Sequence, residues 1–334
     1  MSNLLNVGDR VVASRVWLAP MTGVSDLPFR RAAARLGAAY VATEMVACAE
    51  LARGRPDVVR RAAVGEGLPL MVVQLVGRDP AMMAAGARMA AAAGAEIIDL
   101  NFGCPAKEVT GVQSGSALMR DLELATSLVA AAVDAVDLPV TVKMRLGWDD
   151  ASRNAPEFAA RAQAVGAKAI TVHGRTRSQF YKGEADWAAI AEVKREITVP
   201  LIVNGDIVDL ATARAALQAS GADGVMIGRG AYGRPWIAAQ LDAGLMGRQL
   251  ADPDMETRLA IALDHFRDAL AFYGERLGLR MFRKHLASYI EAAPVPIGPE
   301  VRRAARAELC RLETPAEVEA ALTRLWMTER RMAA

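Results

Sequence analysis

The stretch LIVNGDIVDLATARAALQASGADGVMIGRG (residues 201–230) decides the fold. It begins and ends with short apolar runs, 201–206 and 224–230, and a segment long enough for a helix separates them. Neither run alternates strictly between apolar and polar residues, which is typical of parallel strands buried on both faces. The stretch therefore predicts the strand, helix and strand of an α/β fold.

Similar runs recur along the chain. The eight runs are VWLAPM (16–21), YVATEMV (40–46), LMVVQLV (70–76), EIIDLNF (96–102), VTVKMRL (140–146), AITVHGR (169–175), LIVNGD (201–206) and GVMIGRG (224–230). Gly-Ala pairs precede the even-numbered runs, whereas proline precedes the third, fifth and seventh. Glycine suits the left-handed residue that closes a helix, and proline is tolerated at the first residue of a strand. This repeated unit predicts a TIM (β/α)8 barrel, with an open doubly wound sheet as the alternative.

The pattern changes after residue 246. Helical spacing then runs through four segments, 255–273, 276–292, 299–312 and 315–332. We therefore predict a barrel domain over residues 1–246 and a small all-helical domain over residues 247–334.

Composition favours a globular, cytoplasmic protein. Of the 334 residues, 53% are hydrophobic, which is enough for a large core. The net charge of +2 gives no strong field for indiscriminate binding to nucleic acid, so any RNA site must be a local patch. The start of the sequence has no secretion signal, and no segment suits a membrane span. We expect no membrane partner.

The three cysteines, Cys48, Cys104 and Cys310, are widely spaced and form no CxxC pair. This spacing argues against a disulfide framework or a structural zinc site and suits a reducing cytosol, so we expect no metal. Cys48 and Cys310 lie in helix-like segments rich in alanine and leucine, where we expect small core residues.

Polar side chains gather at the carboxyl ends of the apolar runs, where TIM barrels carry their chemistry. They are Glu44, Gln74, Asn101, Lys143, Arg145, His173, Arg175, Asn204, Asp206 and Arg229. A period of two puts Lys143 and Arg145 on one face of their strand, and the same holds for His173 with Arg175 and for Asn204 with Asp206. Each residue alone could be a hydrogen-bonded barrel-end residue. Burying their cationic groups together would be energetically unfavourable without an anionic partner.

A phosphate is the natural partner. Residues 228–233, GRGAYG, match the GxGxxG dinucleotide fingerprint, but the chain then enters helices instead of a second strand. TIM barrels often bind phosphate in the loops after strands seven and eight, which here contain NGD (204–206) and GRG. With Lys143 at the rim and Gln74 and Asn101 as amide partners, such a site would suit FMN, whose anionic reduced ring a lysine stabilises. Pyridoxal phosphate, with Lys143 as its Schiff-base lysine, is the alternative.

Cys104 lies in DLNFGCPAKEV (99–109), where Gly103 and Pro105 force a turn that exposes the thiol to the predicted cavity. A thiol with a pKa of about 8.5 holds its proton near neutrality, so it can act as a general acid. As a nucleophile it would need a base, and His173 could lie across the rim. A buried loop thiol without chemistry is the structural alternative.

Together these motifs resemble the tRNA-dihydrouridine synthase family, most closely its bacterial DusB branch. The similar motifs span nearly the whole chain: APMTGVSDLPFR (19–30), EM (44–45), VQLVG (73–77), DLNFGCPAKEV (99–109), VTVKMRLGW (140–148), TVHGRTR (171–177), NGDI (204–207) and MIGRGAYGRPW (226–236). The departures are slight, because Thr22 and Gly230 stand where many relatives have alanine, and neither removes a functional group.

The resemblance implies an FMN-dependent oxidoreductase that saturates the C5–C6 bond of a uridine in the D-loop of tRNA, with NADPH reducing the flavin. It implies that Cys104 protonates C5 while the reduced flavin delivers hydride to C6. The residues that it places at the cofactor are Pro20, Met21 and Thr22 along the flavin, Gln74, Lys143 and His173 at the ring, and Asn204, Gly205, Asp206, Gly228 and Arg229 at the ribityl phosphate. It makes Asn101 and Arg175 candidates for contacts to the target base and Lys107 a guide for the RNA.

The helical domain is the expected clamp for tRNA. It carries Arg276, Arg280, Arg283 and Lys284, and positions 276, 280 and 284 share one helix face. An ordinary solvated face, balanced by glutamates such as Glu275, is the alternative from the sequence alone. The resemblance favours the tRNA partner. We also expect a monomer.

Two other functions stay open from the sequence. An FMN barrel that reduces a free pyrimidine would turn over the free base and would not need the helical domain. A non-catalytic RNA-binding protein with a structural flavin would keep its function when Cys104 is replaced by alanine.

Overall fold

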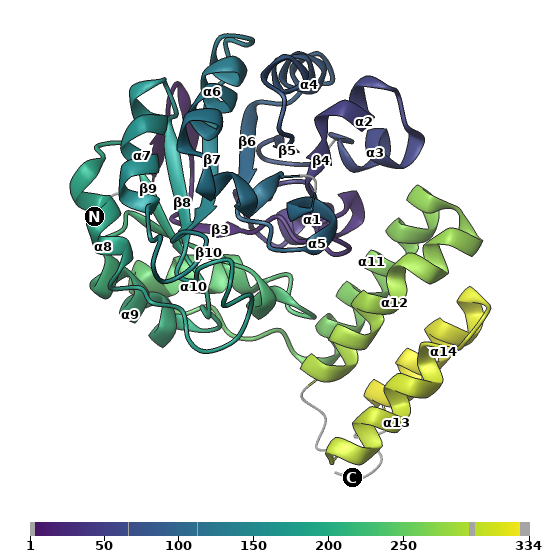
Figure 1. Cartoon of the computed structure of the whole chain (residues 1–334). Helices are drawn as coiled ribbons and strands as arrows, with labels where there is room; N and C mark the ends of the chain where they lie inside the picture. The colour runs from purple at the N-terminus through teal and green to yellow at the C-terminus, as the bar shows by residue number, and fades with distance from the viewer. Residues whose placement is uncertain (1–3, 66, 112, 294–297, 328–334) are drawn as a thin grey trace.

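The computed structural model describes residues 4–65, 67–111, 113–293 and 298–327. In this part of the chain a parallel sheet of eight strands is surrounded by helices, and further helices form a lobe beside it (Figure 1). The strands, in their order around the sheet, are β3 (Val16–Leu18), β10 (Gly224–Ile227), β9 (Leu201–Asn204), β8 (Ala169–His173), β7 (Val140–Arg145), β6 (Ile97–Phe102), β5 (Val72–Val76) and β4 (Val46–Ala47).

The sheet closes on itself. Isolated parallel bridges join Leu18 to Val41 and Ala42 to Val72, and the Leu18 N–H donates a hydrogen bond to the Tyr40 carbonyl (3.0 Å). These bridges connect β3 to β5 through the segment before β4. The TIM barrel prediction is confirmed, and the open doubly wound alternative is wrong.

The second predicted strand is largely absent. The run 40–46 forms only the two bridges and the short β4, because a side chain takes the place of the backbone acceptor. The Gln74 N–H donates to Thr43 Oγ1 (3.0 Å), which interrupts the regular ladder along β5. The other predicted strands form at the expected places and are shorter at one or both ends.

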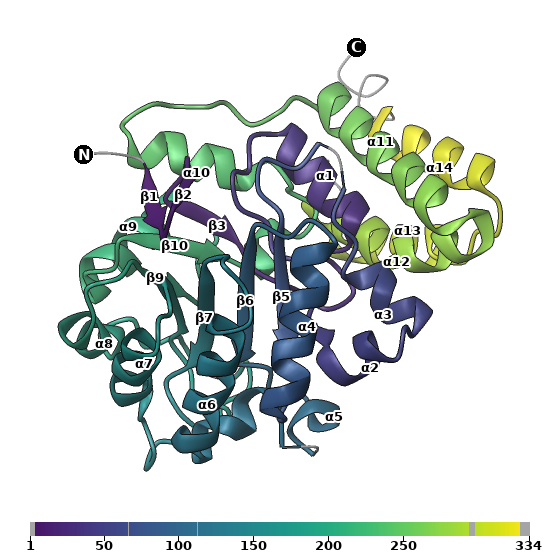
Figure 2. The same cartoon turned by 90° about the horizontal axis from the view of Figure 1, so that it is seen from above.

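Helices cover the outside of the barrel (Figure 2). They are α1 (Leu27–Arg35), α2 (Cys48–Ala52), α3 (Pro56–Arg61), α4 (Pro80–Ala92), α5 (Lys107–Thr110), α6 (Leu122–Val133), α7 (Ala155–Ala164), α8 (Ile190–Glu196), α9 (Leu210–Ser220) and α10 (Ile237–Leu245), with the 3-10 turns η1 (Gly115–Arg120) and η2 (Arg229–Ala231). Several begin at an aspartate whose carboxylate accepts the backbone N–H three residues on, as Asp79 does from Met82 and Asp209 from Thr212. Such caps satisfy N–H groups that have no partner within the helix.

The amino-terminal half of the barrel interior is filled by apolar side chains. Trp17 and Tyr40 stack there with ring centroids 4.0 Å apart. A hairpin of β1 (Leu5–Val7) and β2 (Arg10–Val12), which the sequence analysis did not predict, adds apolar side chains to the same cluster. The hairpin turn packs against Pro139, just before β7, so the hairpin lies at the amino-terminal end of the barrel.

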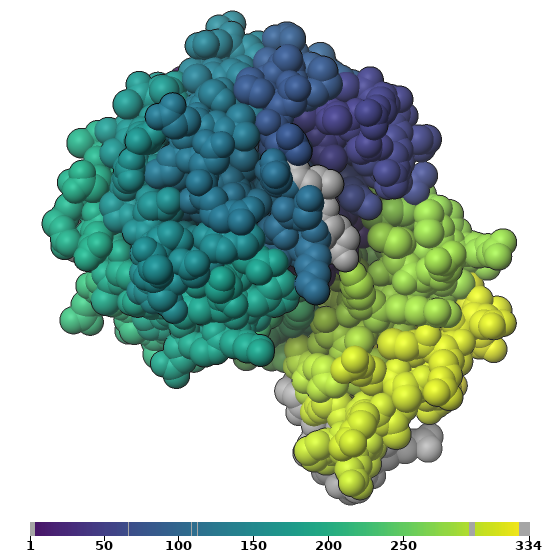
Figure 3. Space-filling model, in the orientation of Figure 1, coloured from purple at the N-terminus to yellow at the C-terminus, as the bar shows by residue number. Residues whose placement is uncertain are grey.

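The helical lobe consists of α11 (Met255–Tyr273), α12 (Glu275–Ala292), α13 (Pro299–Leu309) and α14 (Pro315–Met327). It has its own apolar cluster, which includes Phe266, Phe282 and Leu322, and Figure 3 shows it as a separate mass beside the barrel. The predicted helical region is confirmed, although residues 328–332 of its last segment lie outside the described residues. The division between residues 246 and 247 stays a prediction. No helix in the described ranges is long and apolar enough to cross a bilayer.

The lobe joins the barrel through α1 and the loop after β10. Arg31 and Arg35 of α1 pair with Asp268 of α11 at 3.3 and 3.6 Å. Gly233 has a φ of +66°, and a Cβ atom there would collide with the carbonyl oxygen of Ser288 in α12. In this part of the seam, which is the contact region between barrel and lobe, the backbone of the loop after β10 therefore touches the backbone of α12.

The hairpin provides a matched test of the interior packing. Val7 is fully buried in the barrel cluster, whereas Val11 is 57% exposed on the other strand. We expect Val7→Ala to lower the free energy of unfolding by roughly 2 kcal/mol and Val11→Ala to change it by less than about 0.5 kcal/mol, because only the first leaves a cavity. Urea denaturation of the two variants measures the difference. Equal losses would contradict the assigned place of the hairpin.

Candidate active site

The strand register turns one set of polar side chains toward the barrel axis. Alternate residues below them, such as Ile97 and Ile202, belong to the interior cluster, and residues of the same parity follow toward the carboxyl ends. The register pairs Asn101 with Lys143 and places His173 opposite both Arg145 and Asn204. The predicted candidates Gln74, Asn101, Lys143, His173 and Asn204 thus share the mouth of the barrel.

A buried carboxylate connects several of these side chains. Thr141 Oγ1 donates to Asp99 Oδ1 and Gln74 Nε2 donates to Asp99 Oδ2, each at 2.7 Å, and Asn101 Nδ2 donates to Gln74 Oε1 at 2.8 Å. Burial raises the pKa of Asp99 to about 6, against the opposing effect of these hydrogen bonds and of Lys143. Asp99 was not among the predicted site residues. Its signal was a charged residue two positions before Asn101 in an otherwise apolar run.

The Cys104 loop (residues 103–106) is held on both sides. Asn101 Oδ1 accepts the backbone N–H groups of Gly103 (3.0 Å) and Cys104 (2.9 Å). The carbonyl of Cys104 accepts the backbone N–H (3.1 Å) and the hydroxyl (2.8 Å) of Ser116. The Cys104 side chain is partly exposed and in no disulfide. Its position is therefore set by the barrel interior through Asn101 and by the η1 turn through Ser116.

Arg145 ties the Cys104 loop to the loop after β8. Its Nε donates to the Gly103 carbonyl (2.8 Å), and its Nη1 donates to the carbonyls of Thr176 (2.9 Å) and Phe180 (2.8 Å). Only 3% of the residue is exposed, and burial lowers its pKa to about 10, so it stays charged at neutral pH. Arg145 was predicted to lie at the rim, without an assigned role.

Lys143 and His173 have altered acid–base properties. Burial, followed by the charge of Arg145, lowers the pKa of Lys143 to about 8, while the charges of Asp99 and Cys104 raise it. Burial and the surrounding cations hold the pKa of His173 well below its usual range, so its imidazole is neutral near pH 7. Within the described residues, His173 Nδ1 is buried and has no hydrogen-bond partner. A buried polar atom without a partner indicates that a bound group supplies one.

The loops after β9 and β10 border this mouth. Gly205 has a φ of +115°, and a Cβ atom there would lie 2.7 Å from Ala185 Cβ and 3.2 Å from His173 Nε2, so a side chain would not fit. A Cβ atom at Gly228 would have Ala19 Cβ, 4.0 Å away, as its nearest neighbour among the described atoms, so the backbone there faces open space. The loop after β10 thus leaves room at Gly228, whereas the loop after β9 packs closely against His173.

Asp206 pairs with two arginines at the same loops. It accepts hydrogen bonds from Arg175 Nη2 (2.6 Å) and Arg229 Nη2 (3.0 Å). Arg175 is 1% exposed and also donates to the carbonyls of Lys182 and Gly183. Its guanidinium group is thus buried in a structural network, whereas the side chain of Arg229 is 53% exposed at the rim.

The other candidates lie around the mouth or on the lobe. Pro20, Met21 and Thr22 follow β3, where the Met21 carbonyl accepts the backbone N–H groups of Val24 and Ser25 (both 2.9 Å). Asn204 Nδ2 is buried and donates to the Met226 carbonyl (2.7 Å). The remaining candidates, all with exposed side chains, are Lys107 on α5 and Arg280, Arg283 and Lys284 on α12.

The structure tests the predicted core positions of the other two cysteines. Cys48 is fully buried, as expected for a small core residue. Cys310 follows α13 and is only partly buried, but it packs against the apolar cluster of the lobe, and its Sγ lies 3.6 Å from the Arg283 carbonyl oxygen. It therefore lies at the edge of the lobe core, not inside it.

Comparison with known proteins places the chain in a family. The sequence model described as "Dihydrouridine synthase (Dus)" matches residues 17–325. The chain belongs to the dihydrouridine synthase family. It is therefore an oxidoreductase, and the predicted family is confirmed.

Curated relatives cover most of the chain. It is 54% identical to the probable tRNA-dihydrouridine synthase of Rhodobacter capsulatus, over 86% of this chain and 90% of that protein. It is 51% identical to the probable tRNA-dihydrouridine synthase of Rhizobium leguminosarum, over 93% and 95% of the two chains. The tRNA-dihydrouridine synthase B of Pseudomonas putida is 42% identical, over 87% of this chain and 86% of that protein.

Solved structures share the barrel. Histamine dehydrogenase from Rhizobium sp. 4-9 matches with a TM-score of 0.56 at 12% identity, over 80% of this chain and 50% of that chain. The old yellow enzyme homologue from Zymomonas mobilis matches with a TM-score of 0.51 at 14% identity, over 77% and 95% of the two chains. At these low identities the similarity shows only that the fold is shared.

Replacing Arg145 by lysine tests its part in holding the two loops. Lysine keeps the charge but cannot donate to three carbonyls from one planar group. We expect Arg145→Lys to lower the free energy of unfolding by roughly 2 kcal/mol or more and to speed amide hydrogen exchange in residues 103–111 and 176–182. The control is Arg153→Lys, whose exposed ion pairs with Asp150 and Asp186 contribute less than about 1 kcal/mol. Unchanged exchange in both segments would exclude this role.

Stability should depend on pH through Asp99. Its folded-state pKa of about 6 lies above the ordinary value of 3.8, so folding favours the protonated form. The resulting stabilisation is fully present below about pH 4, is lost as the pH rises through 6, and amounts to roughly 3 kcal/mol. Asp99→Asn removes this titration. We expect the difference in unfolding free energy between wild type and variant to change over that range, and a constant difference would refute the assignment.

Proposed function

We propose that this chain is an FMN-dependent tRNA-dihydrouridine synthase of the DusB type. In the proposed reaction, NADPH reduces the flavin, the C5–C6 bond of a D-loop uridine is saturated, and Cys104 is the general acid. The observation that carries the proposal is the Cys104 loop, which Asn101, Ser116 and Arg145 fix at the barrel mouth beside Lys143. Family membership and the names of the relatives support the same substrate class.

The residues at the mouth fit FMN. His173 has a buried nitrogen without a partner in the described residues, the backbone at Gly228 faces open space, and Arg229 presents a half-exposed cation. We expect Gln74, Lys143 and His173 to contact the ring, and Pro20, Met21 and Thr22 to lie along it. The phosphate would bind at the loops with Asn204, Gly205, Asp206, Gly228 and Arg229. When bound, FMN would supply the hydride for C6 of the uracil.

Asp206 would act at the phosphate only indirectly. A carboxylate repels a phosphate, but Asp206 is neutralised by Arg175 and Arg229. Its side chain therefore orients the Arg229 guanidinium, which is the exposed cation of the pair. Arg175, although predicted to contact the base, is better placed to hold Asp206 and the loop containing Lys182 and Gly183.

Cys104 would supply the proton to C5. A general acid must keep its proton until the reaction, and a cation close to a thiol favours the thiolate. Lys143 is such a cation, and Asp99 opposes its charge from the buried side. The same hydrogen-bonded chain, from Asp99 through Gln74 to Asn101, also anchors the Cys104 backbone. Charge balance and position at the thiol thus depend on one buried carboxylate.

The lobe offers cations for the RNA. Arg276, Arg280, Arg283 and Lys284 are exposed on α12, and Lys284 lies against Gly23 in the loop after β3. This contact makes the basic face of α12 continuous with the barrel mouth. An enzyme that acts on a base within folded RNA must extract that nucleotide and bind the rest through its phosphates. We propose tRNA as the partner of this face and a cytoplasmic monomer as the working form.

A cysteine variant separates the two halves of the reaction. We expect Cys104→Ala to slow dihydrouridine formation in tRNA by about 10²–10⁴-fold, the range of a lost general acid, and to leave flavin reduction by NADPH unchanged. Cys310→Ala, which removes the other partly exposed thiol, should preserve both steps. Flavin bleaching by NADPH under anaerobic conditions measures the first step. Dihydrouridine formed in tRNA that is taken from cells lacking this gene and incubated with each variant measures the second.

Three outcomes would contradict the proposal. A purified protein that cannot be loaded with FMN removes the cofactor assignment. Turnover of free uracil or uridine at the rate of tRNA favours the alternative function as a reductase of free pyrimidines. Full tRNA modification by Cys104→Ala removes the general acid.

A further inference from the structure

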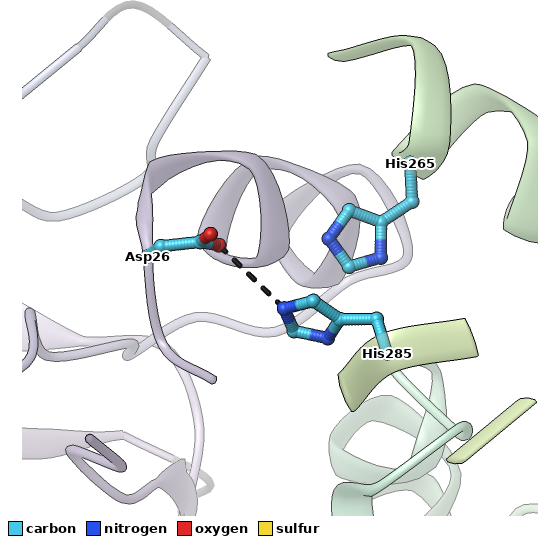
Figure 4. Close-up of side chains that lie close together, drawn as sticks. All are labelled: Asp26, His265 and His285. Carbon is cyan, nitrogen blue, oxygen red and sulfur yellow. Dashed lines mark ion pairs between the residues drawn. The ribbon is translucent and has the colours of Figure 1, made fainter. Parts of the chain in front are cut away.

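We propose that Asp26, His265 and His285 form a divalent-metal site, suited to Zn²⁺, at the seam between the barrel and the helical lobe. One ligand atom from each of the three residues lies within 4.8 Å of the others. Figure 4 shows the carboxylate at the start of α1 directed at the imidazole of His285 on α12, with His265 of α11 beside them. Asp26 follows the loop after β3 and the histidines belong to the lobe, so the site needs both parts of the chain.

The three side chains are buried together. Asp26 is 5%, His265 0% and His285 5% exposed. The two imidazole rings lie with their centroids 4.4 Å apart, and Phe29 and Phe282 pack around them. Charged or polar groups are rarely buried to this degree unless they are paired or bind a metal.

The nitrogen atoms that would bind the metal have no hydrogen-bond partner among the described residues. Nε2 of His265 and Nε2 of His285 are both buried and without a hydrogen-bond partner. The closest approach of His285 Nε2 to Asp26 Oδ1 is 3.9 Å, which is too long for a hydrogen bond. In a tetrahedral zinc site with bonds of about 2.0–2.1 Å, ligand atoms are about 3.3 Å apart. Small side-chain rotations would therefore bring these atoms into range.

The surrounding hydrogen bonds resemble the outer shell of a metal site. His265 Nδ1 is 3.1 Å from Tyr289 Oη, which allows the Nδ1–H tautomer and leaves the lone pair on Nε2. Asp26 Oδ1 accepts the Phe29 N–H (3.0 Å) and Oδ2 accepts the Tyr273 hydroxyl (3.0 Å). Metal-bound histidines and carboxylates usually have such partners, because these fix the orientation of the ligand.

The charges near neutrality also suit a cation. Burial lowers the pKa of His285 to about 3 and holds that of His265 well below its usual range, so both imidazoles are neutral. Burial raises the pKa of Asp26 to about 6, against hydrogen bonds from Phe29 and Tyr273 and the charge of Arg30, so it is mainly ionised at pH 7. Two neutral imidazoles and a carboxylate are a donor set that Zn²⁺ binds in proteins.

This site departs from the expectation of no metal. That expectation rested on the absence of cysteine pairs, whereas these ligands come from the residue before α1 and from α11 and α12, which meet only in the folded chain. A metal bound there would link α1 of the barrel to α11 and α12 of the lobe. It would therefore stabilise the seam between the barrel and the lobe.

The test uses the full-length protein loaded with FMN, dialysed against a chelator and then titrated with Zn²⁺ alone. Bound zinc is measured by plasma emission spectrometry, affinity by calorimetry, and the unfolding temperature with and without Zn²⁺. We expect one Zn²⁺ per chain in wild type and a higher unfolding temperature when it is bound.

The variants are chosen to keep the fold. Asp26→Asn retains a good helix cap but removes the anionic ligand, and His265→Gln removes one imidazole. Both should lose the stoichiometric Zn²⁺ and the rise in unfolding temperature. Tyr289→Phe removes only the outer hydroxyl and should weaken binding roughly 10–100-fold. Cys310→Ser, which removes a thiol that could bind zinc elsewhere, should bind as wild type does.

Several results would overturn the site. They are the absence of Zn²⁺ binding in wild type, equal zinc content in wild type and in folded Asp26→Asn or His265→Gln, and loss of the zinc in Cys310→Ser. Circular dichroism without metal shows whether each variant is folded. If both ligand variants fail to fold, unchanged affinity in Tyr289→Phe is sufficient to reject the proposal.

Discussion

Closure of the parallel sheet is the constraint on which the candidate site depends. The bridges at Leu18 and Ala42 bring the first strand beside the rest of the sheet, so the carboxyl ends of all strands surround one opening. The interior below that opening is filled by Trp17, Tyr40 and the hairpin side chains. Polar side chains of the inward-facing parity can then gather only at the open end. The chemistry of the mouth is thus a consequence of how the other end is packed.

Two buried or half-buried carboxylates make the cationic mouth possible. Asp99 opposes Lys143 from inside the barrel, and Asp206 pairs with Arg175 and Arg229 at the rim. Cations in a low-dielectric environment repel one another strongly unless such charges lie between them. Removing either acid would therefore alter the remaining groups as well as its own contacts. The site is better described as one charge-balanced unit than as a set of separate residues.

Much of the fold follows from local sequence pattern, and its exceptions have identifiable causes. Continuous apolar runs predict β5 to β10 because both faces of each strand are buried. The run 40–46 fails because Thr43 supplies a side-chain acceptor, which apolar periodicity cannot show. The hairpin at β1 and β2 has a Gly-Asp turn between valine-rich segments, a signal that the search for longer runs overlooked.

The candidate site was predicted less completely than the fold. Residues at strand ends were identified because period and position are local properties, and these include Lys143 and His173. Asp99 and the bonds of Arg145 depend on register between neighbouring strands and on loop carbonyls. The grouping of Asp26 with the two lobe histidines depends on how α1 meets α11 and α12. Such long-range contacts arise only when separate elements pack.

The contact between Gly233 and Ser288 has a consequence for the shape of relatives. Because the loop after β10 and α12 touch through backbone atoms, the inclination of the lobe is set by groups that every residue type carries. Side chains elsewhere along the seam can differ in size and charge between relatives while this backbone contact is kept. The lobe would then keep a constant angle to the barrel through long evolutionary drift, as long as position 233 has no side chain.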